Sequence, residues 1–126
     1  MRGMVAGVVL FAVGASPAVA LQVERAVACT EVEAREPVGV AEGFPADVGA
    51  VLLFTRLTGI EAVTTITHVW YHGDREVARI PLGVRPPAWR TWSEKRIYPG
   101  MTGAWRVVVE DAEGRALREA TFTIHE

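Results

Sequence analysis

The stretch Thr64-Thr65-Ile66-Thr67-His68-Val69-Trp70-Tyr71-His72 decides the predicted fold, because β-branched and aromatic residues dominate it and no Gly or Pro interrupts it. Successive side chains of a β-strand point to opposite faces, so Ile66, His68 and Trp70 share one face. We expect that face to meet the core, since a large aromatic residue in a central strand is the usual centre of a β-sandwich.

Six further runs of this kind surround the first, whereas no window shows a sustained helical period. Signals such as Gly73-Asp74, Pro86-Pro87 and Pro99-Gly100 separate them, and Asp111-Ala112-Glu113-Gly114 predicts a hairpin turn. The seven short strands predict an all-β protein, an immunoglobulin-like antiparallel β-sandwich of about seven strands preceded by a signal peptide. The six additional strands are expected at Val23 to Cys29, Ala50 to Leu57, Glu76 to Leu82, Ala88 to Arg96, Trp105 to Glu110 and Leu117 to Ile124.

The N-terminus differs from the rest of the chain, because residues 3–20 carry no charge. Arg2 precedes an apolar run, and Ala18-Val19-Ala20 is an A-x-A cleavage pattern. We expect a signal peptide over residues 1–20, cleaved near Ala20, and a single β-sandwich domain over 21–126 in the periplasm or outside the cell. The alternative is an anchor that is not cleaved, since about 18 apolar residues is the lower limit for spanning a bilayer.

Composition excludes several functional classes. The 126 residues include 13 Lys and Arg, 15 Asp and Glu and a net charge of −2, which removes the usual electrostatic case for nucleic-acid binding. A single cysteine excludes an internal disulfide and every zinc site with several Cys ligands. Cys29 is therefore expected to be either a buried small apolar residue or a thiol free to pair with another chain.

His68 has two interpretations. As a buried strand residue it needs hydrogen-bond partners for its ring nitrogens and helps to set strand register. As a catalytic residue it would act with Ser93, the only serine after Ser16, although neither a G-x-S-x-G nor an S-x-x-K pattern surrounds Ser93. The sequence favours the structural role and a non-catalytic domain, with a small hydrolase using His68 and Ser93 as the less favoured alternative.

Neither a metal nor a cofactor is expected. His68 and His72 are four residues apart on a predicted strand, which places their α-carbons about 13 Å apart, too far to share one ion. His125 lies near the C-terminus, and the Asp111 to Gly114 segment is too short for a calcium-binding loop.

Charge is unevenly distributed along the chain. The segment Arg79 to Arg106 has six basic residues against Glu94 alone, whereas Glu24 to Glu61 has seven acidic residues against three arginines. Within the basic segment, Trp89 and Trp92 have opposite strand parity, so they cannot both be central core residues unless a bulge intervenes. Either a bulge is present or one tryptophan lies near the surface beside Arg or Lys.

An exposed tryptophan beside cations is typical of a binding surface. The ring can stack on sugars or apolar groups, and arginine can bind a carboxylate or phosphate through two hydrogen bonds. Trp89, Arg90, Trp92 and Lys95 are therefore the candidate ligand-binding residues for an anionic glycan, a lipid headgroup or a protein. In the alternative interpretation a tryptophan covers the open edge of the sandwich and Arg90 pairs with Glu36 or another carboxylate.

Several separated motifs resemble the bacterial family known as domain of unknown function 2914. They run from about Cys29 to the C-terminus, and Glu94 departs from the family pattern, which more often has a small residue there. The resemblance implies a compact, mostly β domain, often exported or membrane-tethered, without an established activity. It marks Arg35, Glu36, His68, Trp70 and Ser93, besides the four candidates above, without assigning them roles. The motifs are Arg35-Glu36-Pro37, Phe54-Thr55, Thr67-His68-x-Trp70, Trp89-Arg90-x-Trp92-Ser93-x-Lys95, Gly103-x-Trp105-x-Val107 and Asp111-x-x-Gly114.

Together these observations predict an exported, non-catalytic binding or accessory domain of the bacterial cell envelope that recognises an anionic glycan or another envelope polymer. The alternative is a protein-interaction module that pairs through an exposed strand edge or through Cys29. The expected partner is an envelope glycan or envelope protein, with no nucleic acid and no transmembrane segment after residue 20.

Overall fold

The computed structural model describes residues 20–126, and this part of the chain is built from β-strands without a helix. The predicted signal peptide lies outside the described residues, apart from Ala20. No helix between residues 20 and 126 is long and apolar enough to cross a membrane. The strands are β1 (Gln22–Cys29), β2 (Glu31–Glu33), β3 (Glu36–Val38), β4 (Gly43–Pro45), β5 (Ala50–Thr58), β6 (Thr64–His72), β7 (Arg75–Val84), β8 (Trp89–Arg96), β9 (Gly103–Glu110) and β10 (Ala116–His125).

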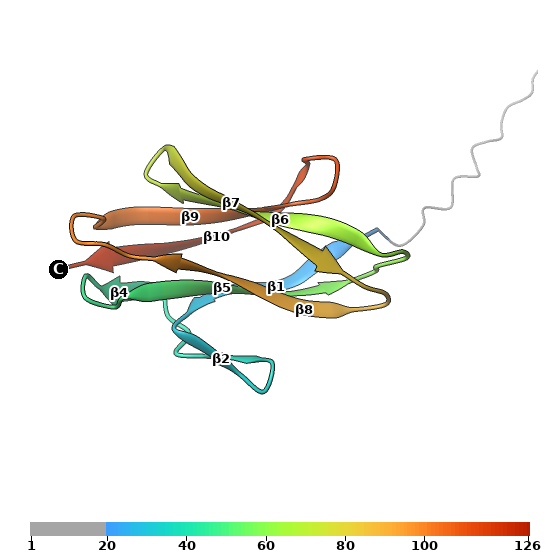
Figure 1. The fold of residues 1–126 in the computed structure, drawn as a ribbon, viewed down its shortest axis with the longest axis horizontal. Coiled ribbons are helices and arrows are strands. Elements are labelled where there is room, and N and C mark those ends of the chain that lie inside the picture. The colour runs from blue at the N-terminus through green and yellow to red at the C-terminus, as the bar shows by residue number, and fades with distance from the viewer. Residues whose placement is uncertain (1–19) are drawn as a thin grey trace, which may run out of the picture.

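Two sheets form the layers of the molecule (Figure 1). One has the order β1-β5-β8, and the other has the order β4-β10-β9-β6-β7. Neighbouring strands are antiparallel except β4 and β10, which run parallel. The strands β2 and β3 form a separate hairpin beside the smaller sheet (Figure 1). This arrangement confirms the predicted all-β sandwich.

All seven predicted strands are present, and their ends differ from the predicted ends by no more than two residues. Sequence reasoning missed β2, β3 and β4. Each of these three strands is only three residues long, and Glu31-Val32-Glu33 carries one apolar side chain between two carboxylates. So short a segment has no periodicity that could be recognised.

The core lies between the two sheets and is centred on aromatic side chains of the larger one. Trp70 of β6, Trp105 of β9 and Phe122 of β10 are all buried. The rings of Trp105 and Phe122 stack with centroids 5.7 Å apart, and Trp70 meets Phe122 edge-on at 6.2 Å. Ile66, His68 and Trp70 share the buried face of β6, as the alternation of that strand predicts.

One side of the sandwich is closed by side-chain and loop contacts to β1. Arg118 of β10 donates through Nη1 to the carbonyl oxygens of Val23, at 2.9 Å, and Glu24, at 3.0 Å. The amide of Ala41 donates to the carbonyl of Ala28 at 3.2 Å. The sheets end in β7 and β8 on the opposite side, so the two sides of the sandwich differ in how their strand edges are covered.

The β2-β3 hairpin turns through two residues in the left-handed region, Ala34 with a φ of 51° and Arg35 with a φ of 63°. Two consecutive positive φ values are typical of a type I′ turn, which matches the twist of the flanking strands and is usually built from Asn and Gly. Residues with a Cβ adopt this conformation at a cost of about 1 kcal/mol or more each. The hairpin therefore stores strain at the position where Arg35 is held.

Substitution of Ala34 by glycine is expected to stabilise the protein. Glycine adopts a positive φ without steric cost, so Ala34→Gly should raise the free energy of unfolding by about 0.5 kcal/mol. Ala112→Gly is the matched control, because Ala112 lies in an exposed turn and its φ is not positive. Urea denaturation should show a lower midpoint for the control. A lower midpoint for Ala34→Gly would contradict the strain argument.

Candidate functional site

The family-motif residues His68, Trp70 and Ser93 meet inside the sandwich, where they form a buried polar network with Thr55. His68 of β6 lies 2.6 Å from the Ser93 hydroxyl of β8 through Nδ1 and 3.2 Å from the Thr55 hydroxyl of β5 through Nε2. Trp70 donates from Nε1 to the Ser93 hydroxyl at 3.1 Å. The Thr55 hydroxyl donates to the carbonyl of Thr91 at 2.8 Å. The network links three strands from both sheets.

One protonation state satisfies every member of this network. Because Thr55 gives its proton to Thr91, its oxygen accepts from Nε2 of His68, which therefore carries the ring proton. Nδ1 then accepts from the Ser93 hydroxyl, whose oxygen accepts from Trp70. The imidazole is neutral in this arrangement. A second ring proton, on Nδ1, would point at the Ser93 hydroxyl, which already donates its own proton to Nδ1.

The Ser93 and His68 side chains are close enough for a nucleophile and its base, but they are not accessible. The exposed fractions are 0% for His68 and 5% for Ser93. Burial lowers the pKa of His68 to about 4, which keeps the ring neutral near pH 7. A substrate would have to enter the centre of the core to reach them. The geometry thus favours the structural role of His68 over the hydrolase.

The four candidate ligand-binding residues lie along β8 but do not converge on one patch. Strand β8 pairs with β5 without a register shift, so no bulge separates Trp89 from Trp92. Trp92 points to the outer face of the smaller sheet, is 37% exposed and stacks on Phe54 at 6.2 Å. Lys95 lies near the other end of β8 from Trp89 and Arg90, where its ammonium is 5.8 Å from the ring centroid of Tyr98. One tryptophan is thus at the surface, the second of the two predicted arrangements.

A hollow of about 400 Å³ lies where β8 begins, and we call it the arginine hollow. The guanidinium carbon of Arg35, from the β2-β3 turn, lies 5.6 Å from the ring centroid of Trp89, and that of Arg85 lies 5.9 Å from it. Both contacts are within the range of cation–π attraction. The hollow is lined by Arg35, Arg56, Ala88, Trp89 and Arg90.

Glu36 and Glu24 accompany the arginines of this region. Arg90 binds Glu36 at 2.8 Å and also donates to the carbonyl of Arg35 at 3.1 Å. Arg56 binds Glu24 at 2.6 Å, and the more distant Arg25 lies 3.8 Å from Glu36. The pair of Arg90 and Glu36 is the one that the sequence offered as an alternative to a binding role. This ion pair joins the basic segment, Arg79 to Arg106, to the acidic segment, Glu24 to Glu61.

Positive charge remains in excess around the hollow. Arg25, Arg56 and Arg90 form ion pairs with two carboxylates, Glu24 and Glu36, while Arg35 and Arg85 take part in no ion pair within the described part of the chain. Glu33, opposite Glu36 in the hairpin, is the further acidic residue beside Arg35. The side chains that do pair are about one-third to one-half exposed. Ion pairs as exposed as these contribute little stability, so an external anion can compete for the same guanidinium groups.

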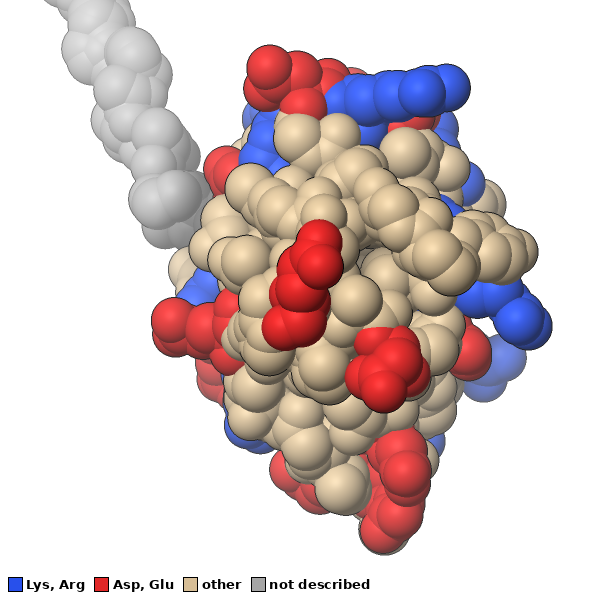
Figure 2. Space-filling model, turned by 90° about the vertical axis from the view of Figure 1, so that its left-hand side faces the viewer, with Lys and Arg blue, Asp and Glu red and all other residues tan. Residues whose placement is uncertain are grey.

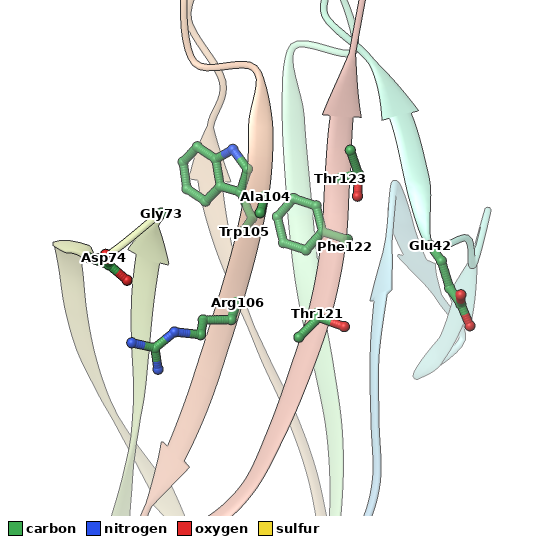
Figure 3. A pocket seen from close by; sticks show the side chains of 9 residues that line it. All are labelled: Glu42, Gly73, Asp74, Ala104, Trp105, Arg106, Thr121, Phe122 and Thr123. Carbon is green, nitrogen blue, oxygen red and sulfur yellow. The ribbon is translucent and has the colours of Figure 1, made fainter.

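A second hollow, of about 380 Å³, lies on the outer face of the larger sheet (Figure 3). Arg106 of β9 extends toward the Asp74 side of this hollow, and its guanidinium carbon lies 3.9 Å above the ring of Tyr71. Glu42 and Asp74 bring negative charge to the same space, so the second hollow does not select one sign of ligand charge. Thr121 and Thr123 add hydroxyl groups.

The end of the sandwich that carries the C-terminus has no basic cluster of its own. Figure 2 shows a mostly uncharged surface there, on which acidic side chains stand singly and Lys and Arg lie at the margin.

Across residues 20–126 no three His, Cys, Asp or Glu side chains gather in a way that could hold a metal ion. Cys29 is fully buried, and burial raises the pKa of its thiol. These features leave the arginine hollow as the candidate site.

Sequence reasoning missed Arg56, which lines this site, and Arg85, which lies beside it against the ring of Trp89. Arg56 lies opposite Arg90 in the β5-β8 register, and Arg85 precedes the Pro86-Pro87 loop that leads into β8. The strand parity of Arg90 was visible, but the register that pairs it with Arg56 was not. The motif Arg35-Glu36-Pro37 was the available signal for the hairpin's contribution.

The fold and its motifs agree with a comparison against known families. Residues 63–124 match the family described as "Protein of unknown function (DUF2914)", which supports the predicted resemblance for this part of the chain. The match covers β6 to β10, including the motifs around His68, Trp89 and Trp105. It does not extend to Arg35 and Glu36, although the resemblance was expected to begin near Cys29. No curated protein matches the sequence.

Protonation of His68 is expected to destabilise the folded state. The pKa of the ring is near 6.5 when exposed and about 4 in the fold, so the unfolded chain binds more protons between these values. The free energy of unfolding should fall as the pH falls through this window, by about 1.4 kcal/mol per pH unit, and His68 should have no effect above it.

Urea denaturation between pH 7 and pH 4 measures this effect. His68→Gln is the comparison, because the amide offers a donor and an acceptor but does not titrate in this range. Subtracting the pH slope of the variant removes the contribution of the carboxylates. Equal slopes for the two proteins would show that His68 is protonated without penalty in the fold.

Proposed function

We propose that the protein is an exported, non-catalytic binding domain of the bacterial cell envelope, and that the arginine hollow receives an anionic group of an envelope polymer. The observation that carries this proposal is the convergence of Arg35, Arg56 and Arg90 on one open hollow. Guanidinium groups bind carboxylate and phosphate through paired, charge-assisted hydrogen bonds, so these two groups are the ligand chemistry.

Trp89 takes a supporting role in this proposal. Guanidinium groups from Arg35 and Arg85 already lie against its ring, which limits the room for a sugar to stack there. The ring instead restricts the two side chains, and a cation held before the ligand arrives loses less conformational entropy on binding. The strained turn at Arg35 favours the same view, because strain is often kept where a functional group must be held.

Export is part of the proposal and rests on the N-terminal sequence. The apolar run after Arg2 and the Ala18-Val19-Ala20 pattern support cleavage near Ala20 and a mature domain over 21–126. Neither the ligand-binding role nor export requires His68 or Ser93, which serve the core. A hydrolase would need these two side chains at a surface.

Removal of one unpaired arginine is expected to abolish ligand retention. The variants are Arg35→Ala and Arg85→Ala. Neither removes an ion pair, because neither arginine takes part in one within the described residues. Alanine keeps the conformational preference of the turn close to that of Arg35, and Arg85 lies in a loop. Arg75→Ala is the matched control, because Arg75 is exposed on β7 and outside the hollow. The fraction bound should fall at least tenfold for the two hollow variants and remain unchanged for the control.

The measurement is cosedimentation with isolated cell-wall polymer, with phosphatidylglycerol vesicles and with phosphatidylcholine vesicles. Retention on the cell wall alone indicates a polymer ligand, and retention on the anionic vesicles alone indicates a lipid phosphate. Binding should weaken as salt is raised, since exposed charges are screened within about 10 Å at 0.1 M. Equal retention of wild type and both hollow variants would refute the arginine hollow as the site.

A further inference from the structure

The free edge of β8 is the most open strand edge of the smaller sheet. That sheet ends in β1 on one side and in β8 on the other. Arg118 and Ala41 occupy carbonyl groups of β1 along its edge. Strand β8 is eight residues long and pairs with β5 alone among the described strands. Strand β7, which precedes it in the chain, lies close to β8 but is not paired with it, so the backbone groups of the other edge have no strand partner.

The hydrogen-bond pattern identifies which backbone groups face this open edge. The amide of Ile97 donates to the carbonyl of Gly49, and the carbonyl of Thr91 accepts from the Thr55 side chain of β5. Odd-numbered residues therefore turn their backbone groups toward β5. In an antiparallel pair the direction alternates, so Arg90, Trp92 and Glu94 turn theirs toward the open edge.

The open segment has a defined length. Beyond it, the carbonyl of Arg96 already accepts from the Lys95 ammonium at 3.1 Å. The other strand edges carry features that discourage pairing with a further strand: β7 contains Pro81, and β4 has only three residues. Between Arg90 and Glu94 the sequence Arg-Thr-Trp-Ser-Glu contains neither proline nor glycine.

We infer that β8 pairs antiparallel with β8 of a second copy of the chain, about a two-fold axis at Trp92. This register places Arg90 opposite Glu94 of the second copy, and the symmetry repeats the pair with the roles exchanged. Trp92 meets its own counterpart. Opposite charges and aromatic pairs are both favourable directly across two antiparallel strands. The contact is isologous, as the interface of a two-fold dimer must be.

The charge pattern selects this register over its neighbours. Pairing through the open edge requires even-numbered residues to face even-numbered residues, so the register changes in steps of two. One step places Arg90 opposite Arg96, where like charges repel. The step in the other direction places Arg90 opposite Trp92 and leaves Glu94 without a cation. Only the register centred on Trp92 places both charges opposite a partner, and Arg90 then shares its guanidinium between Glu36 of its own chain and Glu94 of the second copy.

The exposed surface of Trp92 agrees with this interface. One face of its ring stacks on Phe54, yet the side chain remains 37% exposed, one of the few large apolar side chains that do. In the dimer this surface lies beside the same ring of the second copy, and the two small sheets become one continuous sheet. On the opposite face, Thr91 lies across from Ser93, where both side chains are small.

The test is the molar mass of the purified protein, measured by light scattering and sedimentation from micromolar to millimolar concentration with reductant present. The mass should rise from that of a monomer to that of a dimer. Glu94→Arg sets Arg90 against an arginine in both symmetric pairs, so the dissociation constant should increase at least tenfold. Glu119→Arg is the matched control, because Glu119 is exposed on β10 of the larger sheet and does not belong to the sheet that contains β8, and it should dimerise as the wild type does.

Complementary charges should restore the contact. Arg90→Glu should also weaken the dimer, whereas an equimolar mixture of Arg90→Glu and Glu94→Arg should form the mixed dimer, in which both pairs are again of opposite charge. Circular dichroism confirms that each variant is folded. In the wild type, hydrogen exchange of the Arg90, Trp92 and Glu94 amides should slow as concentration rises.

Three results of the mass measurements would overturn the inference. They are a monomer at every concentration, a dimer that Glu94→Arg leaves unchanged, and a dimer that forms only without reductant, which would indicate pairing through Cys29. Amide protection confined to other strands would equally place the contact elsewhere. Arg90 belongs to both surfaces, but the hollow variants Arg35→Ala and Arg85→Ala leave it in place. Loss of anion binding in these two variants therefore does not require loss of the dimer, so the two proposals fail separately.

Discussion

The buried imidazole of His68 sets the constraint on which the arrangement of the strands depends. A polar ring in the core must have both nitrogens hydrogen-bonded, and its partners come from β5 and β8 in the opposite sheet. Slipping β8 by one residue would remove Ser93 from the core and reverse every side chain of that strand. The inward position of Ser93 therefore also determines that Arg90, Trp92 and Glu94 point outward. The buried hydrogen bond between His68 and Ser93 thus determines which side chains of β8 form the outer surface of the smaller sheet.

Much of the fold could be predicted because its long strands alternate regularly. The buried face of β6 followed from Trp70, and the absence of a bulge in β8 was one of two stated arrangements. The short strands could not be found, since three residues contain no usable period. The partners of His68 could not be named either, because pairing between sheets depends on a register that a single sequence does not reveal.

The residues of the candidate site likewise divide into those that the sequence could identify and those that only strand register brings together. Trp89 and Arg90 were recognisable from their clustering, and Glu36 was named as a partner for Arg90. Arg56 and Arg85 come from a neighbouring strand and a loop, and only the folded register brings them beside the others. Lys95 was grouped with them by sequence proximity alone. Six residues along a strand span about 20 Å, which separates side chains that are close in the sequence.

The parallel pairing of β4 with β10 has a consequence for how the protein folds. Residues 43–45 find their strand partner only in residues 123–125, 80 positions further along the sequence. The larger sheet therefore cannot be completed until segments 80 positions apart in the sequence, such as Gly43 and Thr123, have come together. Contacts between such distant segments slow folding, because a long loop must close before they form. Until that loop closes, β4 has no strand partner and the edge of β10 that it covers stays open.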